Sequence, residues 1–179
     1  MDIGCNAFSG CKNLEVIIIP ENVSTIFNYS FYLCENLKRV VMSDNVYRIN
    51  ERAFFGCKSL KEFVLPKSIN HIGELAFSGC QSLEQIDLER KELYKISERA
   101  FSNCNSLKHI TIPKNINRVE SYAFAYCNEL ESIVVEADAV MAHDCFVDCP
   151  KIKVINITSN NKVMISNWGI SAKKIVIEQ

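Results

Sequence analysis

Three residue types recur together at a nearly constant spacing along this chain of 179 residues, and this repeat constrains the fold more than any other feature. Each copy reads Phe-x-x-Cys-x-x-Leu, with isoleucine in place of leucine in the last copy. Successive phenylalanines are 23, 23, 23, 24, 23 and 22 residues apart. A fixed period of about 20 to 50 residues is typical of stacked-repeat proteins, so we expect about seven coils of one solenoid. The seven phenylalanines are Phe8, Phe31, Phe54, Phe77, Phe101, Phe124 and Phe146.

Each coil is expected to contain a short strand just after its leucine. There the chain reads Leu-x-x-Ile-x-Ile, as in residues 60–65, and the alternation predicts a strand with one buried face. Proline follows three of these strands, as at Pro66, and ends them because it lacks an N–H and fixes φ. A second apolar pair then forms the opposite wall, and Ala-Phe, as in Ala53 and Phe54, starts a brief helical or turn segment.

One repeat is too small to keep its apolar side chains from water, so the coils must stack on one another. The composition shows no break along the chain. We therefore expect a single solenoid domain over residues 1–179, with regular repeats over residues 7–157 and an irregular C-terminal repeat over residues 158–179.

These columns resemble the BspA-like branch of the leucine-rich repeat proteins, whose unit reads close to L-x-x-I-x-I-P-x-x-V-x-x-I-x-x-x-A-F-x-x-C-x-x. The match runs from about Ala7 to Pro150, and Ser30 and Cys145 stand where the family has alanine. The resemblance implies an α/β, mostly β, right-handed leucine-rich repeat solenoid with a concave parallel sheet and short convex strands, turns or helices. It also implies a cell-surface or secreted protein with a role in adhesion, and it brings no catalytic residues.

Charge and hydropathy exclude several classes of partner. The 20 basic and 21 acidic residues nearly cancel, and no basic stripe of the kind that nucleic acid requires is present. No apolar stretch reaches the roughly 18 residues of a membrane span, and the start of the chain lacks the features of a signal peptide. Repeat motifs run close to both termini, so we expect flanking domains in a longer chain or end-to-end self-association.

The nine cysteines first suggest disulfides or a metal site. Seven of them lie in one column of the repeat, where side chains of adjacent coils point in parallel, so we predict buried, structural free thiols. Cys5 lies outside the column and is expected to be exposed and reactive. His143, Cys145 and Cys149 have the spacing H-x-C-x3-C, but a fourth zinc ligand is missing nearby, and we predict neither a metal nor another cofactor.

Motifs that would support catalysis are not found. The sequence contains no phosphate-binding glycine-rich loop, nucleophile elbow or paired-carboxylate motif. Of the scattered histidines, His109 falls on the concave face, with Asp87 and Glu62 on preceding strands, and this arrangement indicates a surface pair rather than a catalytic dyad. We therefore predict that the protein is not an enzyme.

The outward positions of the strands form the candidate partner-binding surface. Aliphatic residues are frequent there, either because β-branched residues suit a strand or because an apolar strip binds a partner. Polar residues of several types interrupt the aliphatic strip in the middle coils, and we predict the partner-binding site there. The candidate residues are Glu62, Val64, Gln85, Asp87, His109 and Thr111.

The leading hypothesis is a non-catalytic protein-binding module that presents its concave sheet to a protein or glycoprotein ligand. A structural spacer in a larger surface protein is the alternative, and an intracellular regulatory scaffold is a third, favoured by the reduced cysteines. Three Asn-x-Ser/Thr sites, at Asn22, Asn28 and Asn156, could carry glycans if the source is a eukaryote that secretes the protein.

Overall fold

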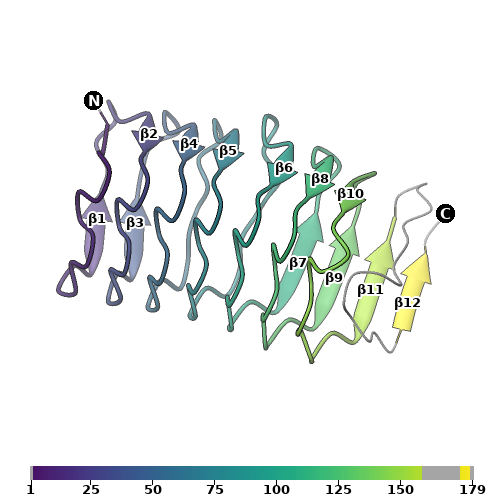
Figure 1. The fold of residues 1–179 in the computed structure, drawn as a ribbon. Coiled ribbons are helices and arrows are strands. Elements are labelled where there is room, and N and C mark those ends of the chain that lie inside the picture. Colours follow the sequence, from purple (N-terminus) through teal and green to yellow (C-terminus); the bar gives the residue numbers. More distant parts are fainter. Residues whose placement is uncertain (1, 159–173, 178–179) are drawn as a thin grey trace.

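The chain winds into one row of stacked coils, in which the first and last strands lie at opposite ends (Figure 1). The computed structural model describes residues 2–158 and 174–177. The face that carries the longer strands is called the concave face below. Its strands are β1 (Val16–Ile18), β3 (Arg39–Val41), β7 (His109–Ile112), β9 (Ser132–Val135), β11 (Val154–Ile157) and β12 (Lys174–Ile177).

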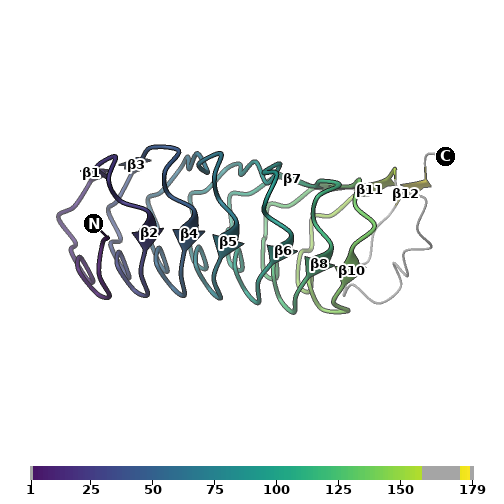
Figure 2. The ribbon, with the colours of Figure 1, turned by 90° about the horizontal axis from the view of Figure 1, so that it is seen from above.

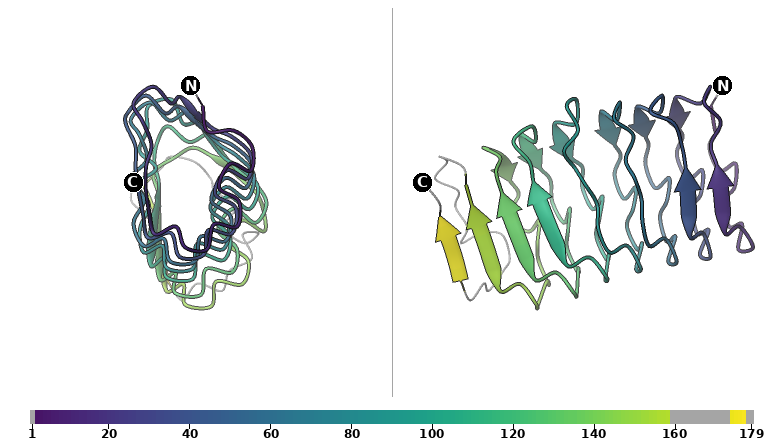
Figure 3. Two further views of the ribbon diagram at one scale, coloured as in Figure 1. Left: turned by 90° about the vertical axis from the view of Figure 1, so that its left-hand side faces the viewer. Right: turned by 180° about the vertical axis from the view of Figure 1, so that it is seen from behind.

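A second row of two-residue strands forms the convex wall (Figure 2). Every strand pair in the described residues is parallel and joins one coil to a neighbouring coil. Seen along the axis, the coils overlie one another as a closed outline (Figure 3). The convex strands are β2 (Thr25–Ile26), β4 (Arg48–Ile49), β5 (His71–Ile72), β6 (Lys95–Ile96), β8 (Arg118–Val119) and β10 (Val140–Met141).

The predicted mostly-β leucine-rich repeat solenoid is confirmed. The Ala-Phe segments, for which a short helix or a turn was expected, are turns, and the described residues contain no helix. The irregular C-terminal repeat predicted for residues 158–179 lies mostly outside the described residues.

The core is a stack of phenylalanine rings flanked by the leucine and isoleucine columns. Neighbouring rings, from Phe8 to Phe146, have centroids 5.1 to 5.5 Å apart and planes within 11° of parallel. Six of the seven rings are fully buried, and Phe8, in the first coil, is half-buried. Each ring thus packs on the ring of the next coil, as the constant spacing of the repeat requires.

Backbone hydrogen bonds at the phenylalanine turns join every coil to the next. At Phe54, the N–H groups of Arg52, Phe54 and Gly56 donate to the carbonyls of residues 74, 76 and 78 at 2.8 to 2.9 Å. The N–H groups between them donate to carbonyls three residues back within the same turn. The same three bonds recur at five of the six junctions, and the turn at Phe124 has two of them, from Phe124 and Tyr126. We call this set of inter-coil bonds the Phe-turn ladder.

The Phe-turn ladder requires left-handed backbone two residues before and two residues after the phenylalanine. At Phe54 these positions are Arg52, with φ of 53°, and Gly56, with φ of 69°. Left-handed backbone is strained for residues other than glycine and persists only where the surroundings hold it in place. Ten non-glycine residues adopt it, and inter-coil bonds from their own N–H groups hold eight of them: Asn6, Tyr29, Leu33, Arg52, Leu75, Arg99, Asn103 and Tyr126. The other two are Tyr122 and Asp148.

The concave sheet is interrupted in its middle, unlike the Phe-turn ladder. β1 pairs with β3, and β7, β9, β11 and β12 form a second sheet. Between them, segments 62–65 and 85–88 share a single bridge, Glu62 to Gln85. Each of these segments contains one β-branched residue, Val64 or Ile86, whereas β7, β9 and β11 contain three each. Low strand propensity therefore accompanies the interruption.

The convex wall is interrupted between β5 and β6, where the coil contains one extra residue after segment 85–88. Side chains replace the missing ladder bonds there. The Arg90 guanidinium donates to the Leu65 carbonyl at 3.0 and 3.1 Å, and the Ser97 hydroxyl donates to the Ile72 carbonyl at 2.5 Å. The insertion is thus accommodated without leaving these two carbonyls unpaired.

The ring stack should be the main source of stability. We expect Phe77→Ala to lower the free energy of unfolding by about 3 to 5 kcal/mol, because it leaves a cavity between two neighbouring rings. Val64→Ala is the control, since that side chain is 78% exposed, and it should change stability by less than about 0.5 kcal/mol. Chemical denaturation measures both, and similar losses for the two variants would contradict the packing account.

His71 should make stability depend on pH. Burial of the imidazole, together with Arg48 and Lys95 on the adjacent strands, lowers its pKa below the ordinary value of 6.5. The unfolded chain then binds the proton more readily than the folded one, so stability is lost as the pH falls from about 7 towards 5. His71→Gln should reduce this loss in urea titrations at a series of pH values. An unchanged pH dependence would show that His71 does not contribute.

Candidate functional site

The outward side chains of the concave face divide into an aliphatic part and a polar part. Ile18, Val41 and Val64, on three successive coils, are 70%, 37% and 78% exposed. The next two coils present the polar residues Gln85, Asp87, His109 and Thr111, all exposed. Exposed aliphatic side chains in a contiguous row are characteristic of interaction surfaces.

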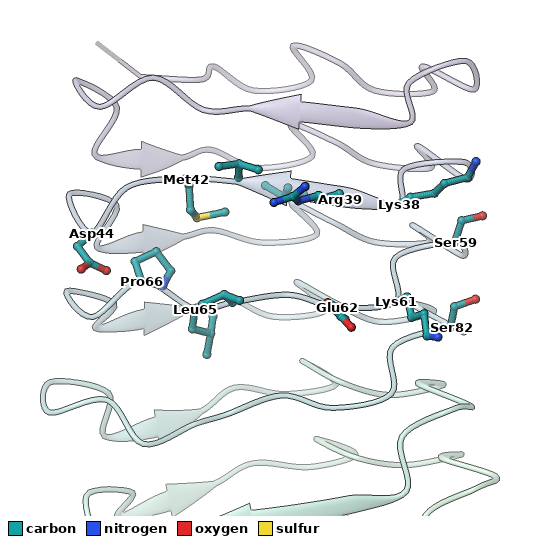
Figure 4. Close-up of a pocket in the computed structure, with 13 residues that line it drawn as sticks. Lys38, Arg39, Met42, Asp44, Ser59, Lys61, Glu62, Leu65, Pro66 and Ser82 are labelled. Carbon is teal, nitrogen blue, oxygen red and sulfur yellow. The ribbon is translucent and has the colours of Figure 1, made fainter.

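A hollow of about 800 Å³ lies between β3 and segment 62–65 (Figure 4), and we call it the inter-coil groove. Lys38 and Lys61 lie at one end of it, and Asp44 lies at the other. Figure 4 shows Arg39 and Glu62 in the middle, on facing coils. The walls between the charged groups are aliphatic: Val41, Met42, Val64, Leu65 and Pro66.

A second, smaller hollow of about 380 Å³ lies where segment 85–88 meets β7. Asp87, His109 and Thr111 line it, together with Pro113 and Glu136. Both hollows thus coincide with interruptions of the concave sheet.

The six predicted partner-binding residues all lie on one face but not in one pocket. Glu62 and Val64 line the inter-coil groove, whereas Asp87, His109 and Thr111 line the second hollow. Gln85 lies in the segment between the two hollows and is joined to Glu62 through the backbone bridge.

His109 and Asp87 have different partners from those suggested by the sequence. The Arg90 guanidinium lies 2.7 Å from the Asp87 carboxylate. Partial burial opposes ionisation of Asp87, but hydrogen bonds from Arg90 and from the Glu89 N–H outweigh it and lower the pKa of Asp87. The His109 Nδ1 atom instead lies 2.7 Å from the Ser132 hydroxyl.

The His109 and Ser132 contact has the residue types of a nucleophile and its base, but it lacks the surroundings that catalysis needs. His109 is exposed, and no carboxylate among the described residues hydrogen-bonds its imidazole. Orientation of the base by an acid and donors for an oxyanion are the features that distinguish a catalytic pair from a surface contact. The geometry is that of a hydrogen bond across two strands.

The cysteine column forms a row of buried free thiols, as predicted, in six of its seven members. Each buried thiol donates to the carbonyl of the phenylalanine one coil earlier, at 3.0 to 3.4 Å. Cys11, in the first of the described coils, departs from the prediction and is exposed. Cys5 is exposed, as expected.

The H-x-C-x3-C segment is divided between the surface and the core. His143 is exposed while Cys145 and Cys149 are buried in the core. Within residues 2–158 and 174–177, no three His, Cys, Asp or Glu side chains are grouped so that they could hold a metal ion.

The sequence did not single out the inter-coil groove, because it depends on how two coils pair. Arg39 is one of the outward strand positions of the predicted surface but was not among the six candidate residues, and Met42 and Asp44 were not predicted at all. The sequence contains one indication of the groove, because Phe63 occupies a column that is aliphatic in the other coils. The aliphatic residues of this column are Ile17, Val40, Ile86, Ile110, Ile133 and Ile155.

The family model of the BspA type leucine-rich repeat region matches residues 1–91 and 48–168 in six copies, and the chain belongs to this family. The family is built on a non-catalytic repeat fold, and leucine-rich repeat proteins generally bind other proteins. None of the described residues forms a helix able to cross a bilayer. A comparison with curated proteins finds no match.

Solved structures share the fold. A leucine-rich repeat protein of T. pallidum is 26% identical, with a TM-score of 0.73 over 88% of this chain and 78% of its own. A leucine-rich cell-surface protein of Faecalibacterium prausnitzii is 22% identical, with a TM-score of 0.51 over 97% of this chain. A leucine-rich repeat protein of Eubacterium ventriosum is 20% identical, with a TM-score of 0.56 over 91% of this chain. The chain spans 62% and 49% of the length of the last two proteins.

Thiol reactivity should distinguish the seven buried cysteines from the two exposed ones. Burial raises the pKa of Cys34 to about 11 and that of Cys104 to about 12, so both are protonated at neutral pH as well as shielded. We expect a colorimetric thiol reagent at pH 8 to label Cys5 and Cys11 rapidly and the seven buried thiols only after denaturation.

Cys5→Ser is the matched control for this labelling and should leave one rapidly reacting thiol. Rapid labelling of more than two thiols in the folded protein would show that the cysteine column is open to solvent.

Proposed function

We propose that this protein is a non-catalytic binding module whose concave face holds a protein or glycoprotein ligand. The observation that carries the proposal is the exposed row of aliphatic and polar side chains over five successive coils, from Ile18 to Thr111. These side chains stand on a wall whose coils are held together by the Phe-turn ladder. A rigid scaffold with variable outward side chains suits recognition of a macromolecule, since binding then costs little ordering of the surface.

The proposed location is the cell surface, with a role in adhesion to other cells. Support comes from family membership and from the F. prausnitzii relative, which is described as a cell-surface protein. We further propose Glu62, Val64, Gln85, Asp87, His109 and Thr111 as residues that contact the ligand, because they occupy both hollows of the concave face and the segment between them.

A structural spacer remains the second candidate. The Phe-turn ladder continues through all six junctions, including those at which the sheets are interrupted, and such a continuous element sets a fixed length. The function of a spacer would depend on the number of coils, which sets its length, and not on the identity of the concave side chains.

Replacing Glu62, Gln85, Asp87, His109 and Thr111 together with alanine should reduce binding of the protein to ligand-bearing cells at least about tenfold. These side chains are exposed, so the melting temperature should fall by no more than a few degrees. Cell binding of the labelled protein and a thermal melt measure the two effects.

The matched control replaces five exposed convex residues from successive coils, Tyr47, Asn70, Tyr94, Asn117 and Val140, and should bind normally. Equal binding by the concave variant and the wild-type protein would contradict the proposed site. If deletion of one coil abolished binding while both alanine variants kept it, the spacer function would be favoured.

A further inference from the structure

At the inter-coil groove, the concave segments of two adjacent coils are not paired, although the coils stay joined at their phenylalanine turns. Phe63, which occupies an aliphatic column, is 5% exposed and packs edge-on against two rings of the central stack. Its ring centroid lies 5.1 Å from that of Phe54 and 4.7 Å from that of Phe77. An aromatic ring fills more of the core than isoleucine or valine does, and this larger side chain accompanies the missing pairing between β3 and segment 62–65.

The missing strand pairing leaves backbone groups available along the groove. In the described part of the chain, no backbone hydrogen bond joins β3 to segment 62–65, although β3 pairs through its other edge with β1. Val64 makes no inter-coil backbone hydrogen bond on either side. Unpaired strand edges are surfaces that accept an extended chain through main-chain hydrogen bonds.

Charged side chains at the two ends of the groove form ion pairs, whereas the charged side chains in its middle form none with the described part of the chain. Lys38 pairs with Glu15 at 2.9 Å, Lys61 with Glu84 at 3.3 Å, and Asp44 with Lys67 at 3.8 Å. Arg39 and Glu62, which face each other across the groove, form no ion pair within the described residues. An unpaired guanidinium and an unpaired carboxylate therefore lie beside the exposed Val41 and Val64.

We propose that the inter-coil groove binds an extended peptide segment that carries an acidic, a basic and an aliphatic side chain. The acidic group pairs with Arg39, the basic group pairs with Glu62, and the aliphatic side chain packs on Val41 and Val64. The peptide lies over the groove on the concave side, and its main-chain groups hydrogen-bond to backbone groups of β3 and segment 62–65. The two coils stay stacked, with the ring centroids of Phe31 and Phe54 5.1 Å apart. This inference rests on the proposed binding function of the concave face and identifies a linear element of its ligand.

The test uses a set of fluorescein-labelled octapeptides with acetylated and amidated ends, in which valine alternates with threonine. Each peptide carries one aspartate and one lysine, and the set covers every pair of positions for these two residues. Fluorescence polarisation should detect at least one peptide that binds the full chain. N-methylation of its alternate amides should weaken binding about tenfold or more, since each lost hydrogen bond removes a main-chain contact. No binding by any peptide, or equal binding of the N-methylated form, would overturn the proposal.

Variants of the protein test the groove itself. Arg39→Ala should weaken peptide binding about tenfold by removing a charge-assisted contact. Phe63→Ile should weaken it as strongly while leaving Arg39 and Glu62 in place, because the smaller side chain lets the coils pair. Asn156→Ala, on β11 of the same face, is the control and should bind normally. Wild-type affinity in both Arg39→Ala and Phe63→Ile would place the peptide elsewhere and overturn the proposal.

The two proposals fail in different ways. If no peptide binds but the five-residue concave variant loses cell binding, the groove proposal is wrong and the binding module stands. If a peptide binds in an Arg39-dependent manner while the concave variant still binds cells, the groove is a peptide site and the proposed set of concave contact residues is wrong. If a peptide binds but the wild-type protein binds no cells, the groove stands and the proposed role in cell adhesion is wrong.

Discussion

Stacking of each phenylalanine turn on the next is the interaction on which the other features of this solenoid depend. The rings form a continuous row, and alternate backbone N–H groups of each turn donate to the following coil. Residues with no preference for left-handed backbone, such as Leu33 and Leu75, adopt it at these turns. Their strain is tolerated because unpaired backbone groups in the same place would cost more.

The Phe-turn ladder lets the other two walls vary. The concave sheet parts beside segment 62–65 and again after segment 85–88, and the convex wall absorbs an extra residue with the help of Arg90. None of these interruptions separates the coils, because the turns remain paired. A binding face can therefore change its side chains and its pairing without loss of the fold. The inter-coil groove is one such change in pairing, and we propose that ligand recognition uses it.

The core could be predicted from the sequence because it depends on a repeated local pattern. Phe54, Cys57 and Leu60 are all fully buried, as their shared period indicated. The left-handed positions could not be predicted, because their occupants vary and only glycines such as Gly56 suggest them. The candidate residues were placed on the correct face, but their division between two hollows depends on pairing between coils, which a repeat pattern does not specify. Phe63 and the few β-branched residues nearby were the available signals.

Amide hydrogen exchange resolved by residue tests the role of the Phe-turn ladder most directly. The amides of Phe31, Phe54, Phe77 and Phe101, which donate to the next coil, should be among the slowest to exchange and should open together. The Val64 amide, which has no inter-coil bond, should exchange much faster. Exchange of the phenylalanine amides at the rate of Val64 would contradict the claim that these turns hold the coils together.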